Sequence, residues 1–278
     1  HLELSTTVGK GGYAMTAVPE WDFVSDAELA GAAATGDRVA FAGIYDRYAD
    51  RLHDFCVGMV RDRDAAADCV QDTFCTAAIR LSSLRDHDKL RPWRYAIARN
   101  EALRRIRERR REQPSDDLPE ATSSEPGTDT MAARTELAEL IAQVAGGLSD
   151  RDRAVLELTY RHGLDGPELA DALGVSVAGA RTLTHRLRET IERSLGALLV
   201  ARRARTGQGC PALGALLADW AGQFTILMRK RIARHIDSCP TCEDQRGRLA
   251  NPVALLGGAP LFIPCPAGLR ERTLDRIQ

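Results

Sequence analysis

The sequence has few aromatic residues, no long apolar run and no regular cysteine spacing. Aromatic residues make up 5% of its 278 positions, and the abundance of alanine, leucine and arginine favours helices over sheets. No apolar stretch approaches the ~20 residues that span a bilayer, so we expect no association with a membrane. No signal-peptide pattern opens the chain, and seven cysteines, an odd number, do not make a disulfide framework. We therefore expect a helical protein of the reducing cytoplasm.

The chain also lacks the usual marks of an enzyme. It contains no nucleophile–base pair and no glycine-rich loop that would cradle a phosphate, so we expect no catalytic activity. The net charge of −1 excludes little, because the charges are unevenly distributed. Residues 91–111 hold nine arginines against two glutamates, whereas residues 112–130 hold six acidic residues and no lysine or arginine. This asymmetry suggests one face for an anionic partner and one segment that avoids it.

Apolar periodicity predicts a series of helices. Ser25 and Glu28 have the spacing of a capping box, and apolar residues then recur at three- and four-residue steps over 38–60. A third helix is expected from about residue 65 to 80, and Pro92 is expected to be the first residue of a fourth. After an irregular, proline-containing stretch, helices resume near residue 131 and continue to about 205.

A helix-turn-helix pattern lies between residues 165 and 188. Pro167 begins a short helix, Gly174 suits the left-handed residue that ends it, and Ser176 caps the next helix. The outer face of the second helix carries polar and basic groups that can reach base edges and phosphates in a major groove. The candidates are Ser176, Arg181, Thr182, His185, Arg186 and Arg188. The alternative is a plain helical hairpin with a solvated charged face.

The helix expected after Pro92 combines aromatic and basic residues. Arginine cations neutralise phosphates, and aromatic rings can stack on unpaired bases, so the combination suits DNA that is being opened. The candidates are Arg91, Trp93, Arg94, Tyr95, Arg99, Asn100 and Arg104. A solvated basic face with Trp93 in the core is the alternative.

An acidic stripe occupies the preceding helix. Asp64, Asp68 and Asp72 recur every four residues, with Gln71 beside them. Like charges at this spacing repel by roughly a few tenths of a kcal/mol per pair, so we expect a basic partner to compensate them. Either another molecule or neighbouring arginines of the same chain can supply that charge.

Taken together, these motifs resemble a bacterial RNA polymerase sigma factor of the extracytoplasmic-function group. The resemblance extends from Ser25 to about Arg203. It rests on six ordered segments: GDRVAF (36–41), YDRY (45–48), DCVQDTF (68–74), RPWRYAIARN (91–100), LSDRDRAVL (148–156) and LGVS (173–176).

The resemblance implies a role for each segment. Asp68, Gln71 and Asp72 match the surface that docks on the clamp helices of the polymerase's largest subunit. Residues 82–88 and the helix after Pro92 match the part that melts and reads the minus-ten promoter element. The helix-turn-helix matches the reader of the minus-thirty-five element, and the acidic stretch matches the linker that runs through the active-site cleft and RNA exit path.

The stretch RHIDSCPTC has the spacing of a metal site. His235 and Cys239 lie four residues apart, so a helix presents both on one face, and Cys242 follows after a proline-containing turn. Cys210 lies twenty-five residues before His235, ahead of an amphipathic pattern that we expect to form one helix up to residue 227. We expect Cys210, His235, Cys239 and Cys242 to hold a structural Zn²⁺ in a closed tetrahedral site. A metal-free hairpin or a reactive cysteine pair is the alternative.

This spacing is also similar to that of the zinc-binding anti-sigma domain. In that domain a His and two Cys ligands are completed by a fourth ligand that lies upstream in the sequence. Such domains usually belong to a separate protein. We interpret the C-terminal part as one of these domains fused behind the DNA-reading part, where it modulates promoter access in cis.

The predicted fold is all-α, with two helical sigma domains joined by a flexible acidic linker and followed by a small helical zinc-binding domain. The expected parts are an expression remnant and disordered N-terminus (1–20), a region-two domain (21–112), the linker (113–132), a region-four domain (133–205), the anti-sigma-like zinc domain (206–250) and a tail (251–278).

The predicted function is promoter-specific transcription initiation, with RNA polymerase core and promoter DNA as partners. A stand-alone helix-turn-helix regulator is one alternative, and a zinc-dependent sensor that sequesters protein partners is another. A separate anti-sigma or other regulatory protein is left open as a further partner.

Overall fold

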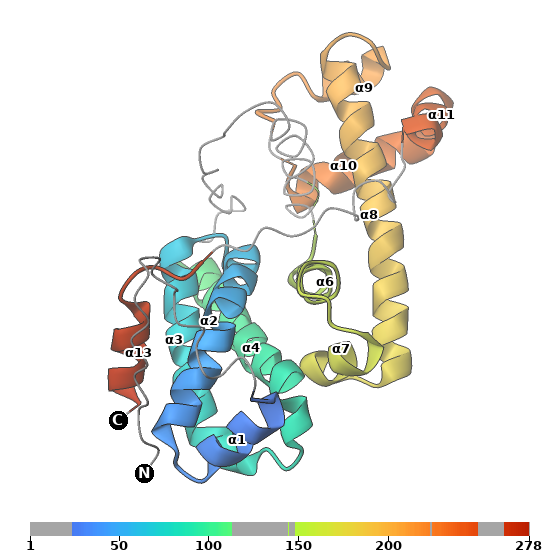
Figure 1. The fold of residues 1–278 in the computed structure, drawn as a ribbon. Helices are drawn as coiled ribbons and strands as arrows, with labels where there is room; N and C mark the ends of the chain where they lie inside the picture. Colours follow the sequence, from blue (N-terminus) through green and yellow to red (C-terminus); the bar gives the residue numbers. More distant parts are fainter. Residues whose placement is uncertain (1–23, 113–143, 145–147, 223, 250–263, 278) are drawn as a thin grey trace, which may run out of the picture.

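The computed structural model describes residues 24–112, 144, 148–222, 224–249 and 264–277. Within these residues every regular element is a helix, which confirms the predicted all-α fold (Figure 1). None of the helices in these ranges is both long enough and apolar enough to cross a bilayer. The expected N-terminal remnant, the acidic linker and the first part of the tail lie outside the described residues.

The first module is a helical bundle. It consists of α1 (Asp26–Ala34), α2 (Arg38–Val60), α3 (Arg63–Arg80), the short turns η2 (Leu81–Ser83) and η3 (His87–Lys89), and α4 (Leu90–Glu112). Ser25 and Glu28 form the predicted capping box at the start of α1. Helix α4 begins two residues before Pro92, because η3 leads directly into it and the first-turn N–H groups need no helical acceptor.

The second module contains the predicted helix-turn-helix. Its elements are α6 (Asp150–Leu156), the π-helical turn η4 (Glu157–Arg161), α7 (Gly166–Leu173) and α8 (Val177–Arg205). Gly174 ends α7 in the left-handed region (φ +67°), and the Ser176 hydroxyl accepts the backbone N–H of Gly179, as predicted. Helix α8 is 29 residues long and continues well beyond the motif, so its second half supports the helices that follow.

The C-terminal module packs on the distal half of α8. It consists of α9 (Pro211–Leu216), α10 (Ile226–Ser238) and α11 (Pro240–Leu249). The single helix expected up to residue 227 is wrong. Helix α9 ends at Leu216, Gly222 adopts a left-handed conformation (φ +99°) that no α-helix contains, and Thr225 caps a new helix. Consequently Leu227, expected on the apolar side, is 66% exposed.

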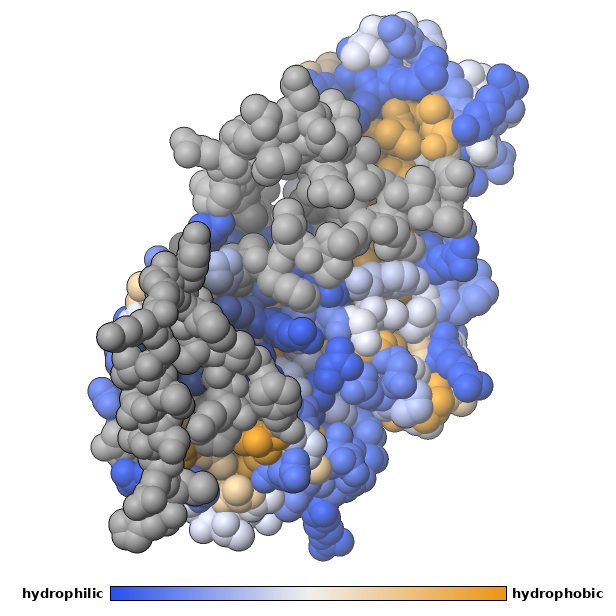
Figure 2. Space-filling model, viewed as in Figure 1, coloured by the Kyte–Doolittle hydropathy of each residue, from blue (hydrophilic) through white to orange (hydrophobic). Residues whose placement is uncertain are grey.

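The last helix, α13 (Leu269–Arg276), lies away from the C-terminal module that precedes it in sequence. It packs along α3, on the side of the first module opposite α7 (Figure 1). Figure 2 shows hydrophilic side chains over most of the visible described surface, with apolar patches near α7 and between α10 and α11. The C-terminal helix therefore packs on the first module, although the C-terminal module precedes it in sequence.

A buried polar cluster joins the first and second modules. The Asp54 carboxylate of α2 is fully buried and accepts two hydrogen bonds from Arg161 of η4, both 2.6 Å long. His162 and Glu157 are buried beside it. Gly58 leaves room for this cluster, since a Cβ there would lie 2.5 Å from the Glu157 carboxyl carbon. The two modules thus share one interior.

Further ion pairs surround this cluster at the surface between the two modules. They join Lys89 to Asp171 (3.1 Å), Arg91 to Glu168 (2.6 Å) and Arg110 to Asp150 (2.8 Å). The pairs connect η3 and the two ends of α4 to α6 or α7. The described structure is therefore a closed arrangement of the two modules.

Candidate functional site

The acidic stripe of α3 is paired with arginines of α4. Arg105 donates to both Asp68 and Asp72 (3.0 Å each), and Arg104 donates to Asp72 (2.9 Å). The charge that compensates Asp68 and Asp72 therefore comes from the same chain, which is one of the two alternatives that the sequence left open. The Asp68 side chain is still 59% exposed, so it remains accessible to a partner.

The C-terminal helix covers another part of the same surface. The Gln71 side-chain amide donates to the backbone carbonyl of Arg272 (3.3 Å), and Arg276 donates back to the Gln71 oxygen (3.3 Å). Arg276 also lies 3.6 Å from the Asp72 carboxylate. Sequence reasoning missed this contact. The available signal in the sequence was the group of arginines in the tail, because basic residues can pair with the acidic stripe of α3.

Two of the candidate minus-ten residues lie in the interior. Arg94 is buried over the ring of Tyr48, 3.0 Å from its centroid, and donates to the Leu90 carbonyl. Tyr95 is buried edge-on against Phe55, with ring centroids 5.6 Å apart. Neither side chain can reach DNA in this arrangement. We therefore correct the prediction for both residues and assign them to the core, because the face of α4 that carries them packs against α2.

The other minus-ten candidates are at least partly accessible. Arg91 is occupied by the second module, since it donates to Glu168 (2.6 Å) and to the His162 carbonyl (2.5 Å). Trp93 and Arg99 are half-buried, Asn100 is exposed, and Arg104 pairs with acidic neighbours while remaining partly exposed. Trp93 packs against the hydrophobic core and keeps part of its side chain exposed.

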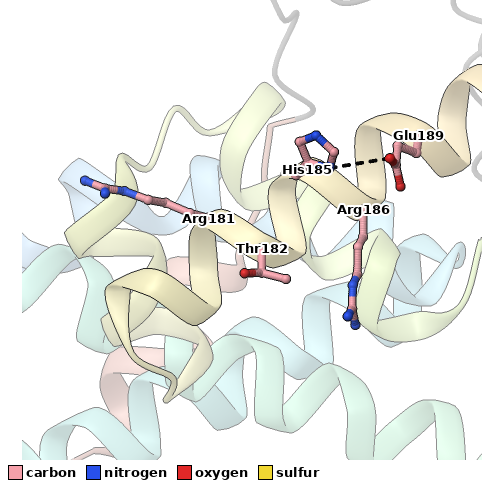
Figure 3. A pocket seen from close by; sticks show the side chains of 5 residues that line it. All are labelled: Arg181, Thr182, His185, Arg186 and Glu189. Atoms are coloured by element: carbon pink, nitrogen blue, oxygen red, sulfur yellow. Dashed lines mark ion pairs between the residues drawn. The ribbon is translucent and has the colours of Figure 1, made fainter.

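The outer face of α8 is exposed as predicted. Arg181, Thr182, His185 and Arg186, together with Glu189, line a surface pocket (Figure 3). In that view Arg181 and Arg186 extend from the helix in different directions, with Thr182 between them. His185 lies 3.6 Å from Glu189. The remaining candidates are also exposed: Ser176 serves as the helix cap, and Arg188 pairs with Glu192 (3.4 Å).

The four predicted metal ligands come together. Cys210 precedes α9, His235 lies in the last turn of α10, Cys239 ends that helix, and Cys242 lies in α11. Their ligand atoms all lie within 4.8 Å of one another. The Cys210 sulfur is 3.6 Å from His235 Nε2 and 3.9 Å from the Cys239 sulfur. Tetrahedral zinc–sulfur and zinc–nitrogen bonds of about 2.3 and 2.0 Å place ligand atoms ~3.5–3.8 Å apart, so the cluster fits such a cation.

The two thiols of the Cys-x-x-Cys turn have opposite electrostatic environments. The backbone N–H of Cys242 points at the Cys239 sulfur and lowers the pKa of that thiol. Burial raises the pKa of Cys242 to about 12. A cation among the sulfurs would stabilise both as thiolates, which are the form that ligates metal. The four residues could therefore hold a metal ion.

Comparison with known proteins identifies the family. Sigma-70 region 2 matches residues 44–112, and Sigma-70 region 4 matches residues 138–191. RNA polymerase sigma factor NccH of Alcaligenes xylosoxydans xylosoxydans is 35% identical over 171 residues, which cover 59% of this chain and 90% of NccH. This chain belongs to the RNA polymerase sigma factors. As a sigma factor it acts in promoter-directed transcription initiation, with RNA polymerase core and promoter DNA as partners.

A further relative that carries the extracytoplasmic-function (ECF) name supports that group for this sigma factor. ECF RNA polymerase sigma factor SigM of Bacillus subtilis (strain 168) is 29% identical over 150 residues, covering 54% of this chain and 91% of SigM. RNA polymerase sigma factor CnrH of Cupriavidus metallidurans is 30% identical over 183 residues, covering 62% of this chain and 95% of CnrH. The region 2 match falls on α2 to α4, and the region 4 match includes α6, α7 and the first half of α8.

Proposed function

We propose that Asp68, Gln71 and Asp72 of α3 contact the clamp helices of the largest polymerase subunit. The supporting observation is their position on one surface of region 2, where Asp68 is largely exposed. The arginines of α4 hold the carboxylates in place while leaving acidic charge at the surface. A basic partner surface can therefore add to these contacts without rearranging α3.

For promoter DNA, α8 reads the minus-thirty-five duplex through Arg181, Thr182, His185, Arg186 and Arg188, with Ser176 at the helix start. The exposure of these groups and their position on the second helix of the helix-turn-helix support this assignment. Helix α4 contacts the minus-ten element through Arg91, Trp93, Arg99, Asn100 and Arg104. Because Arg91 is bound to Glu168, minus-ten contact requires the two modules to separate at that edge.

The C-terminal module holds a structural Zn²⁺ through Cys210, His235, Cys239 and Cys242 and modulates sigma activity in cis. The ion, when bound, supplies a cross-link between α9, α10 and α11. The chain's own residues connect the module to α8, because α10 and α11 pack on the distal half of that helix. The module is thereby connected through one continuous helix to the minus-thirty-five reader.

In-vitro transcription tests this function. Purified core polymerase and a genomic promoter library are combined with the full chain, with Cys242→Ser, or with no added chain. Specific initiation that depends on the chain supports the sigma role, whereas footprinting without core would favour a stand-alone regulator. Changed transcription in Cys242→Ser supports cis modulation, and unchanged transcription after confirmed loss of zinc would exclude it.

A further inference from the structure

Helix α13 is bound to region 2 at two points that lie on different helices. At its start, Arg270 forms two hydrogen bonds to the Asp46 carboxylate of α2 (2.6 and 2.9 Å). Just before the helix, the backbone N–H of Cys265 donates to Asp50, one turn further along α2 (2.8 Å). The segment therefore begins on an acidic edge of α2.

At its other end, α13 is bound to α3. Arg276 contacts both Gln71 (3.3 Å) and Asp72 (3.6 Å), and Gln71 donates to the carbonyl of Arg272. These are two of the three residues that we assign to polymerase binding. The Gln71 amide and one Asp72 oxygen face α13, while the other Asp72 oxygen accepts from Arg104 and Arg105.

The part of α13 between the basic ends is buried. Leu269 and Thr273, one turn apart on α13, are buried, and Leu269 is part of the hydrophobic core. An eight-residue helix has little stability of its own in water, so the helical form of α13 depends on its packing against region 2. The exposed ion pairs at its ends are individually weak, so this packing is reversible.

We propose that α13 is an intramolecular competitor of polymerase core. It covers Gln71 and Asp72, presents arginines to an acidic surface formed by Asp46, Asp50 and Asp72, and so occupies the place of a basic polymerase surface. This inference rests on the proposed core-binding role of α3. Because α13 is tethered to its site, its effective concentration is high, and even a weak contact competes with a partner in solution.

The test compares core binding by full-length variants. Arg270→Glu/Arg276→Glu places acidic groups against Asp46 and Asp72 and releases α13. Arg272→Glu is the matched control, because it makes the same change on the same helix at an exposed side chain with no ion pair to any described residue. A chain that ends at residue 263 removes α13 without adding charge. If α13 is docked in about nine-tenths of molecules, its release tightens the apparent Kd for core by about tenfold.

Hydrogen exchange provides the direct readout of docking. Amides of residues 269–276 are expected to exchange faster in the double variant, and faster in the wild-type chain once core is added. Core affinity equal in the wild-type chain, the double variant and the shortened chain would overturn the inference while leaving the sigma role intact. Failure of every chain, including the shortened one, to bind core would overturn the proposed role of α3 and the inference with it.

Discussion

Arg161 of η4 and Asp54 of α2 form a two-point ion pair across the boundary between regions 4 and 2. Both hydrogen bonds are 2.6 Å, and the residues are 107 positions apart in sequence. Asp54 is fully buried, whereas the Arg161 side chain is 34% exposed. A buried carboxylate is costly without a cation, so Asp54 depends on Arg161 for as long as the two regions are packed together.

Arg161→Met is expected to destabilise the closed structure. It leaves Asp54 buried without its principal cation, a change that costs about 3–5 kcal/mol in a fully buried pair and about 2–3 kcal/mol here, because Arg161 is partly solvated. Urea unfolding measures the change. The control is Arg161→Met/Asp54→Leu, which removes both charges and should recover most of the loss. If the double variant loses as much free energy of unfolding as Arg161→Met and Asp54→Leu lose together, the pairing is contradicted.

Glu157→Gln is expected to change how stability depends on pH. Burial is the main cause that raises the pKa of Glu157 from 4.5 to about 7, against the opposing effect of Arg161 and Arg153. Between these values the native state keeps a proton that the unfolded chain releases, so stability falls as pH rises through this window. Glutamine removes that loss, and the variant should gain up to about 3 kcal/mol relative to wild type by pH 7.

Unfolding measured at several pH values checks this prediction. His162→Gln is a useful control, because burial lowers the pKa of His162 from 6.5 to about 4 and the sign is opposite. Between pH 6.5 and 4 the unfolded chain carries this proton and the native state does not, so stability falls as pH drops through this window. The control should remove this loss. A stability difference between wild type and Glu157→Gln that stays constant with pH would rule out a protonated Glu157.

Cys242→Ser is expected to abolish zinc binding and loosen the C-terminal module. Cys242 is fully buried within the ligand cluster, and serine is a poor zinc ligand. Elemental analysis should show one zinc per chain in the wild-type protein and a small fraction of that in the variant. Cys75→Ser, at a half-buried cysteine of α3, is the control and should retain the metal. Retention of zinc by Cys242→Ser would remove this residue from the ligand set.

Arg186→Ala is expected to weaken binding of the sigma–core complex to promoter DNA. Loss of one phosphate contact should reduce the slope of log affinity against log salt by about 1. Arg203→Ala is the matched control, since it is an exposed arginine of the same helix about 25 Å further along its axis. Equal salt slopes for the two variants would show that Arg186 does not contact phosphate.

Local patterns determined much of this protein. The Ser25–Glu28 capping box, the left-handed Gly174 and the Ser176 cap all lie where the sequence predicts them. The metal-ligand cluster also forms as expected, although the helix predicted between Cys210 and the other ligands is broken. These features depend on residues within about one helical turn, or on strict ligand chemistry, and both can be recognised in the sequence alone.

Only the tertiary structure decided which charged groups are free. Arg94 and Tyr95 lie in a basic, aromatic stretch that reads as a DNA surface, yet the packing of α4 on α2 turns both inward. Gln71 meets Arg272 across 201 residues of sequence, a contact for which helical periodicity carries no information. Periodicity gives the apolar face of each helix, but the partner of a polar side chain depends on which distant helix packs beside it.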